Sequence, residues 1–287
     1  MKIKLLILAF LSCLTFLSVS GQDIVKPGIY TKSISIHNPA TETIRKENYN
    51  SLDIYAKHKF IDNINWKKDM NIMLNYAGRY EKVAGFWTAS YLYDNYSYYN
   101  RHIFTLGYGT NWNFSEERYL SVGARGVFNF DNVRWYNLYN YQGSDDRESL
   151  YLTPDVDIGI EYGSARIRTG ISLRNAIGTA RDLRRDGVIL YNRRMLFSYV
   201  EYRHYLASDY EIGYHLSTYF ERSLTADIGF SLKYKEKFNL IYTFRVLEAR
   251  HVGGFMIDFE KLNLGIVCDI SHLHRDHNLE IVMGMRF

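Results

Sequence analysis

The sequence predicts an all-β protein, a transmembrane antiparallel β-barrel of about fourteen strands with short periplasmic turns and longer extracellular loops. Three observations predict it. Segments of about ten residues alternate between apolar and polar side chains along most of the chain. After residue 21 no continuous apolar stretch is long enough for a spanning helix, which needs about 20 residues. Aromatic residues make up 16% of the chain, with 26 Tyr against 3 Pro, and Tyr suits the girdles of a membrane barrel.

The N-terminal 21 residues have the three parts of a secretory signal peptide. Two lysines, Lys2 and Lys4, precede an apolar run from Leu5 to Leu17, and small residues follow up to Gly21. We therefore expect residues 1–21 to be a signal peptide. Residues 22–50 are expected to form an N-terminal periplasmic segment, and residues 51–287 the outer-membrane β-barrel.

The alternation is clearest in the last expected strand. One face is wholly apolar and carries Leu279, Ile281, Met283, Met285 and Phe287. The other face carries Asn278, Glu280, Val282, Gly284 and Arg286. Similar alternation predicts strands near 262–271, 238–246, 224–233, 210–217, 165–174 and 120–130. Weaker patterns predict strands near 51–60, 70–77, 85–93, 102–114, 154–162, 195–205 and 251–259.

Alternation alone also fits a soluble β-sandwich, so loop lengths are needed to separate the two folds. If the C-terminus lies in the periplasm, the expected periplasmic connections are all fairly short: Gly78–Ala84, Ser115–Tyr119, Gly163–Ser164, Leu206–Asp209, Tyr234–Lys237 and Glu260–Lys261. The two longest connections, 131–153 and 175–194, both fall on the extracellular side. Short turns on one side and long loops on the other are typical of a membrane barrel.

The expected inner face is charged, and its two signs balance. It carries Arg166, Arg168, Arg174, Lys233, Arg245 and Arg286, together with Asp157, Glu161, Glu211, Asp227, Asp269 and Glu280. Buried charges must be paired or hydrated. We therefore expect a salt-bridge network across the barrel and a narrow or closed lumen, since an ion-selective pore more often has rings of one sign.

No catalytic, cofactor-binding or metal-binding residue is predicted, and we expect no enzyme. The sequence has no HExxH pattern, nucleophile elbow, phosphate loop or dinucleotide fingerprint. His272, His274, Asp276 and His277 have the residue types of a metal site, but a polar extracellular turn is the simpler interpretation. The net charge of +4 is spread along the chain, which argues against a nucleic-acid partner.

Several short motifs resemble the PorP/SprF family of outer-membrane proteins from the type IX secretion system of Bacteroidetes. Gln22-Asp23 and Asn38-Pro39-Ala40 stand where that family has a Gln-Asp start and an Asn-Pro-Ala motif. Near the end, Asp269-Ile270-Ser271, Asn278-Leu279-Glu280-Ile281 and Arg286-Phe287 match its closing segments. Two family features are missing: Ser33-Ile34 replaces an earlier Asn-Pro pair, and Lys57-His58-Lys59-Phe60 replaces an Arg-Asn-Gln-Trp segment. The chain resembles a divergent member.

The resemblance implies a barrel in outer-membrane lipid that helps to export or surface-anchor large secreted adhesins, including those of gliding motility. Its partners would then be an adhesin and other components of the secretion system. The alternative from another class is a porin or a transporter of small hydrophobic ligands, and conductance in a planar bilayer would distinguish the two.

The first prediction concerns export and location. The mature chain should begin at Gln22, fractionate with the outer membrane and migrate differently on a gel before and after boiling, because a closed barrel resists detergent until heated. N-terminal sequencing and gel electrophoresis of membrane fractions test this. Recovery of the chain as a soluble periplasmic protein would contradict the barrel.

Overall fold

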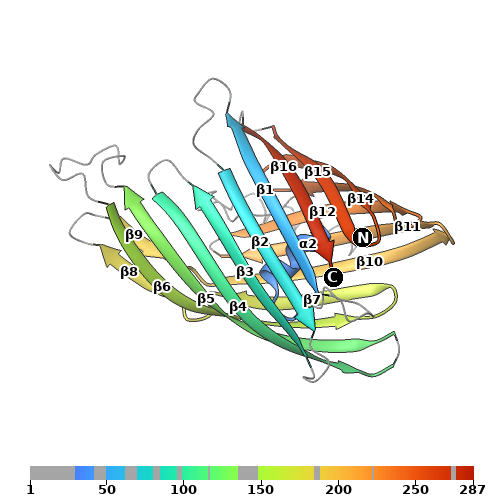
Figure 1. Cartoon of the computed structure of the whole chain (residues 1–287), viewed down its shortest axis with the longest axis horizontal. Helices are drawn as coiled ribbons and strands as arrows, with labels where there is room; N and C mark the ends of the chain where they lie inside the picture. Colours follow the sequence, from blue (N-terminus) through green and yellow to red (C-terminus); the bar gives the residue numbers. More distant parts are fainter. Residues whose placement is uncertain are drawn as a thin grey trace, which may run out of the picture.

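The computed structural model describes residues 30–41, 50–61, 70–79, 85–95, 99–115, 117–134, 148–183, 188–221, 223–272 and 276–287. Fourteen antiparallel strands close into a single barrel, in the order β1-β16-β15-β14-β13-β12-β11-β10-β7-β6-β5-β4-β3-β2 (Figure 1). The predicted fold class and strand number are therefore confirmed.

The strands lie close to their predicted positions. Those of the barrel are β1 (Ser51–Ile61), β2 (Met70–Arg79), β3 (Phe86–Asn95), β4 (Tyr99–Asn113), β5 (Tyr119–Arg134), β6 (Glu148–Gly163), β7 (Ile167–Arg174), β10 (Met195–Ala207), β11 (Tyr210–Phe220), β12 (Leu224–Tyr234), β13 (Phe238–Arg245), β14 (Arg250–Asp258), β15 (Leu262–Ser271) and β16 (Asp276–Arg286). A separate hairpin consists of β8 (Ala180–Leu183) and β9 (Val188–Tyr191), and the helix α2 spans Tyr30–His37.

The barrel closes where the first strand meets the last. β1 and β16 pair from Ser51↔Arg286 to Ile61↔Asp276, and Asn50 and Phe287 exchange two backbone hydrogen bonds of 2.9 Å just beyond the ladder. Closure is required because backbone N–H and C=O groups have no water to bond inside a bilayer. Among the described residues, no helix is long and apolar enough to cross a membrane.

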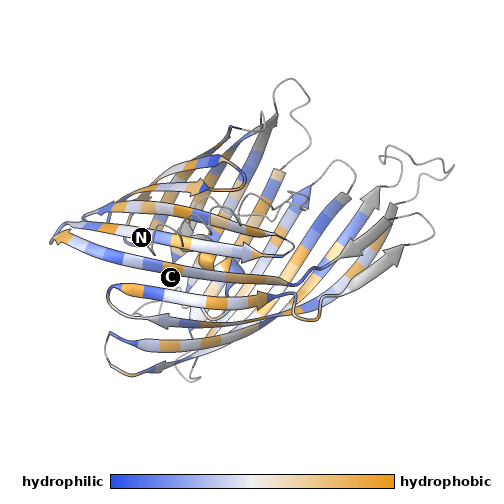
Figure 2. Ribbon diagram, turned by 180° about the vertical axis from the view of Figure 1, so that it is seen from behind, coloured by the Kyte–Doolittle hydropathy of each residue, from blue (hydrophilic) through white to orange (hydrophobic). Residues whose placement is uncertain are grey.

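The two faces of the strands are as predicted. Outward side chains are apolar and exposed, for example Ile228 at 51% and Ile281 at 56%, whereas the inward Asp227, Asp269 and Glu280 are buried. Figure 2 shows the resulting alternation of hydrophobic and hydrophilic residues along the ribbons. In a membrane, the outward side chains face lipid and the inward ones face the lumen.

The two ends of the barrel differ. At one, which we name the turn end, the strands are joined by the connections 80–85, 114–118, 164–166, 208–209, 235–237 and 259–261. At the other, the loop end, the longest connections are 135–147 and 175–194. Predicted short turns and long loops are thus on opposite ends, as expected for a membrane barrel.

Both long connections differ in detail from the prediction. β5 and β6 extend the barrel wall into 131–134 and 148–153, with pairing up to Arg134↔Glu148, so that loop is shorter than expected. The connection 175–194 contains the hairpin β8–β9, which its charge-dense sequence did not reveal because no apolar alternation marks it. Residues 135–147 lie outside the described part of the chain.

The second prediction tests which face meets lipid. Ile228→Arg should destabilise the folded barrel by about 2–4 kcal/mol if Ile228 lies near the bilayer midplane, since a cation there faces hydrocarbon. Ser231→Arg, on the inward face of the same strand, should cost less because the new cation reaches the lumen. Refolding titrations of both variants into lipid vesicles compare the two losses of folding stability. Equal losses, or a larger loss for Ser231→Arg, would mean that the two faces have been exchanged.

Candidate functional site

The lumen is occupied by α2 and the turn that follows it (Figure 1). Ile34 is fully buried in an apolar cluster with Phe197 and Tyr199 of β10. Ile36, two residues later, packs against a second cluster formed on the other side of the barrel by inward residues of β1, β2 and β13–β16: Tyr55, Met73, Ile241, Val252, Met256, Val267 and Val282. The helix thus bridges the lumen, and full burial of Ile34 contributes about 1.5–3 kcal/mol.

Residues 30–41 belong to the stretch 22–50 that the sequence groups as a periplasmic segment, yet they lie inside the barrel. We name them the luminal segment. The division of the chain at residues 21 and 50 stays a prediction, because residues 1–29 and 42–49 lie outside the described part.

Side chains of the wall satisfy the C-terminal end of α2. Arg125 of β5 donates to the carbonyl oxygens of Ser35, at 3.1 Å, and Ile36, and Ser172 of β7 donates to that of His37 at 2.7 Å. The last carbonyls of a helix have no partner within it and carry partial negative charge, so a cation there is favourable. This end of the helix is therefore fixed to β5 and β7.

The Asn38-Pro39-Ala40 motif forms a tight turn directly after the helix. The backbone N–H of Thr41 donates to the carbonyl oxygen of Asn38 at 3.1 Å, and the N–H of Ala40 donates to the Asn38 side-chain oxygen at 2.9 Å. Proline presets the backbone at this second position of the turn, and Asn commonly bonds the backbone two residues on. The Asn38 amide nitrogen also donates to the carbonyl oxygen of Ile160 at 3.0 Å, which ties the turn to β6.

Glycines on the wall make room for this turn. Gly123 of β5 and Gly159 of β6 are register partners in the sheet. A Cβ at Gly123 would overlap the backbone of Pro39, and one at Gly159 would overlap the Asn38 side chain. The turn can lie against the sheet only because both positions lack a side chain.

Glu161 links the turn to three strands through one fully buried carboxylate. It accepts hydrogen bonds from Thr41 at 3.0 Å, from Tyr119 at 2.7 Å and from Tyr199. Arg168 forms an ion pair with it at 3.1 Å. A buried carboxylate is costly unless it is paired and hydrogen-bonded. Thr41 therefore adds a donor from the luminal segment to the donors that the wall provides.

Among the described residues, the ion pairs of the inner face run along the wall. The predicted salt-bridge network across the lumen is not found there. Arg125 pairs with Asp157 on the adjacent strand at 2.8 Å, and Arg245 reaches Asp269 two strands away at 3.1 Å. Further pairs are Arg174–Asp157, Arg168–Glu201, Arg203–Glu201, Arg203–Glu211, Arg245–Asp227, Arg250–Asp269 and Lys57–Asp269. Since barrel diameter grows with strand number, a fourteen-stranded wall is too wide for direct contact between opposite side chains.

Most of the predicted luminal charges are inward and at least half-buried, but two are not. Arg166 is exposed in a connection of the turn end, and Arg286 is 46% exposed at the rim, where its strand ends. Arg166 lies just before β7 begins, and Arg286 is the last residue of β16. Period-two alternation does not show where the barrel wall ends, so it could not reveal that both positions are exposed.

The histidine-rich turn gives no metal site in the described ranges, where no three His, Cys, Asp or Glu side chains are arranged to hold an ion. His272 makes an edge-on ring contact with His251 at 4.7 Å between centroids, and His274 lies outside those ranges.

The luminal contacts of Asn38 and Thr41 were not predicted from the sequence. There, the Asn-Pro-Ala motif indicated only a resemblance to a family and no position in the barrel.

A family model described as "Type IX secretion system membrane protein PorP/SprF" matches residues 30–282. The chain belongs to the PorP/SprF family. The match begins at Tyr30, the first residue of α2, and therefore includes the luminal segment. No curated protein matches the chain.

Solved structures with the same fold are outer-membrane barrels. The Acinetobacter baumannii outer membrane protein Omp33 matches with a TM-score of 0.51 and 8% identity over 84% of this chain and 100% of its own. The CymD monoaromatic hydrocarbon channel matches with a TM-score of 0.56 and 10% identity over 96% and 95%. A Pseudomonas aeruginosa FadL homologue matches with a TM-score of 0.51 and 8% identity over 89% and 93%. At this identity the likeness shows the fold alone.

The third prediction tests the anchoring of the luminal segment. Gly123→Ala should displace the turn at Pro39, because the added methyl would meet backbone atoms that cannot rotate away, and should destabilise the barrel by about 1–3 kcal/mol. Gly126→Ala is the matched control: it lies on the same strand, and its Cβ would be 3.5 Å from the nearest atom, on Phe128. Planar-bilayer conductance and the temperature of the gel-mobility shift are the measurements. Only Gly123→Ala should raise conductance and lower that temperature; identical behaviour of the two variants would show that Gly123 does not hold the turn.

Proposed function

We propose that this PorP/SprF protein acts in type IX secretion as a plugged outer-membrane barrel whose work is protein–protein contact. It would help to export or surface-anchor large secreted adhesins, with no catalytic role. The observation that carries the proposal is the filled lumen, in which α2 contacts apolar clusters on both sides and the wall charges pair with one another. A solute pore needs a continuous hydrated path, and this interior favours a scaffold instead.

We further propose that residues 1–21 direct export and that the turn end faces the periplasm. Short turns at the periplasmic side and longer loops outside are usual for such barrels. The contact surface for an exported protein would then be the loop end.

At the loop end, β6 rises beyond its neighbour β7. β6 begins at Glu148, whereas its pairing with β7 covers only Ile158–Gly163. The connection after β7 bonds to the upper part of β6: Ala176 N–H donates to the Val156 carbonyl at 2.7 Å. Leu150 and Leu152, on the outward face above this level, are 67% and 45% exposed.

This overhang is a suitable place for a partner strand. A sheet edge can add a strand from another chain, with main-chain hydrogen bonds providing affinity. Thr153 already accepts a hydrogen bond from the Asn192 side chain at 3.2 Å, so added pairing would lie above it. Pro154 has no N–H to donate and is tolerated in a sheet mainly at edges. It would limit how far such pairing extends, which is one way that proteins avoid indiscriminate association through an edge.

The fourth prediction tests the secretion role at this surface. Removal of residues 142–147, which precede β6, should leave the barrel folded because exposed loop tips tolerate change. It should reduce surface display of a co-expressed type IX adhesin, as judged by antibody labelling of intact cells. Removal of the whole protein gives the lower limit of display.

The control for this test is removal of residues 63–68, in the connection between β1 and β2 on another part of the loop end. This variant should display the adhesin normally. Undiminished display without residues 142–147 would move the contact elsewhere, and undiminished display without the whole protein would contradict the secretion role. High conductance of the intact barrel would favour the porin alternative.

A further inference from the structure

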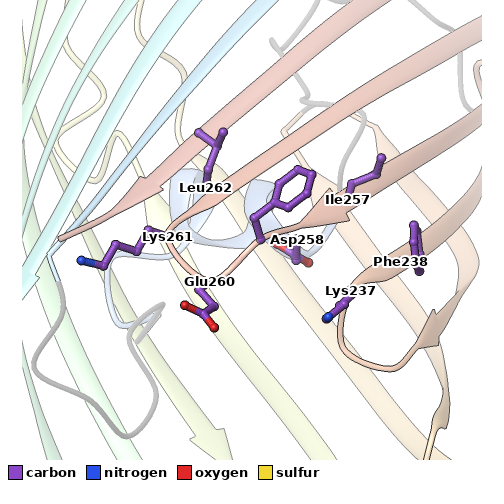
Figure 3. Close-up of a pocket in the computed structure, with 8 residues that line it drawn as sticks. Lys237, Phe238, Ile257, Asp258, Glu260, Lys261 and Leu262 are labelled. Carbon is purple, nitrogen blue, oxygen red and sulfur yellow. The ribbon is translucent and has the colours of Figure 1, made fainter.

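A hollow of 560 Å³ opens on the barrel at the turn end, beside the connections 235–237 and 259–261. Its lining consists of Lys237, Phe238, Ile257, Asp258, Phe259, Glu260, Lys261 and Leu262 (Figure 3). Phe238 and Ile257 face each other across β13 and β14, and Phe238 and Phe259 are exposed by 41% and 54%. The floor of the hollow therefore belongs to the outward, lipid-facing surface.

The hollow lies at the level of the membrane boundary. Exposed aromatic side chains surround the outside of the barrel close to the turns: Trp87, Trp112, Phe114, Tyr162, Tyr205, Tyr210, Phe238, Phe259 and Phe287. Such girdles mark the interface where hydrocarbon gives way to head groups. A ligand in the hollow would thus have its apolar part in the bilayer and its polar part at the level of the turns.

Charged groups of both signs stand at the polar side of the hollow. Lys237, Glu260 and Lys261 are exposed, and no ion-pair partner is found for any of them in the described part of the chain. Asp258 differs, since Arg286 approaches it at 3.8 Å. The hollow therefore offers two ammonium groups and one carboxylate beside an apolar floor.

We propose that this hollow binds an aminophospholipid, of which phosphatidylethanolamine is the probe. Lys237 and Lys261 stand on opposite sides of the hollow (Figure 3), and their flexible side chains would turn inward to bind the phosphate. The head-group ammonium would donate to Glu260, and the first part of an acyl chain would cover Phe238, Ile257 and Leu262. Phosphatidylglycerol has no cation for Glu260, and the quaternary ammonium of phosphatidylcholine has no N–H to donate. The site is independent of the secretion role and of the luminal segment.

The test is native mass spectrometry of the mature barrel in mild detergent with phosphatidylethanolamine, phosphatidylglycerol or phosphatidylcholine of the same acyl chains. The unmodified barrel should retain phosphatidylethanolamine best. Lys237→Ala with Lys261→Ala should weaken that binding by up to about fivefold for each lysine removed, because a surface ion pair contributes up to about 1 kcal/mol. Glu260→Gln should remove the preference for phosphatidylethanolamine over phosphatidylglycerol.

Lys235→Ala is the matched control, because Lys235 belongs to the same connection but does not line the hollow and lies over the Tyr234 ring at 5.2 Å. It should bind lipid like the unmodified barrel, and all variants should keep the gel-mobility shift of a folded barrel. Equal retention of the three lipids would show only a general lipid annulus and overturn the proposal. So would unchanged binding by the double lysine variant, or an equal loss on Lys235→Ala.

Discussion

The need to pair every backbone group inside a bilayer is the constraint on which the rest of this structure depends. In hydrocarbon, an unpaired N–H or C=O costs several kcal/mol, so a sheet in the membrane must have no open edge there. The ladder between β1 and β16 meets this need. Once the sheet is closed, its inner face can no longer pack against another sheet or a layer of helices, and its contents must come from its own side chains or from another part of the chain.

This barrel uses both sources. Arginines and carboxylates on adjacent strands, or on strands two apart, pair along the wall, which leaves most of those charges compensated without contact across the lumen. The centre is filled by the luminal segment, whose helix places Ile34 and Ile36 against apolar clusters of different parts of the wall. Polar and apolar interiors are thus combined: hydrogen bonds fix the position of the segment, and apolar contacts bury Ile34 fully and Ile36 in part.

The anchoring of the turn shows how small residues and a single carboxylate act together. Gly123 and Gly159 allow the backbone at Pro39 to approach the sheet, and this approach brings Thr41 within hydrogen-bonding distance of Glu161. The family match that begins at α2 includes this arrangement. Barrels of known structure share the architecture at 8–10% identity. The strand pattern therefore does not determine which side chains fill the interior.

The sequence by itself determined the class of fold, the positions of the fourteen strands and the two faces of each, because period-two alternation is a local property and closure leaves few other arrangements. It could not reveal the luminal segment. Asn38 and Thr41 are far from Gly123 and Glu161 in the chain, and only the closed sheet brings the turn and these wall residues together. Nor could it distinguish pairing along the wall from pairing across the lumen, since that depends on barrel width and strand register. The apolar cluster around Val252 and Val282 was hidden for the same reason: these residues share a face with charged neighbours, and the helix that covers them comes from outside the strand pattern.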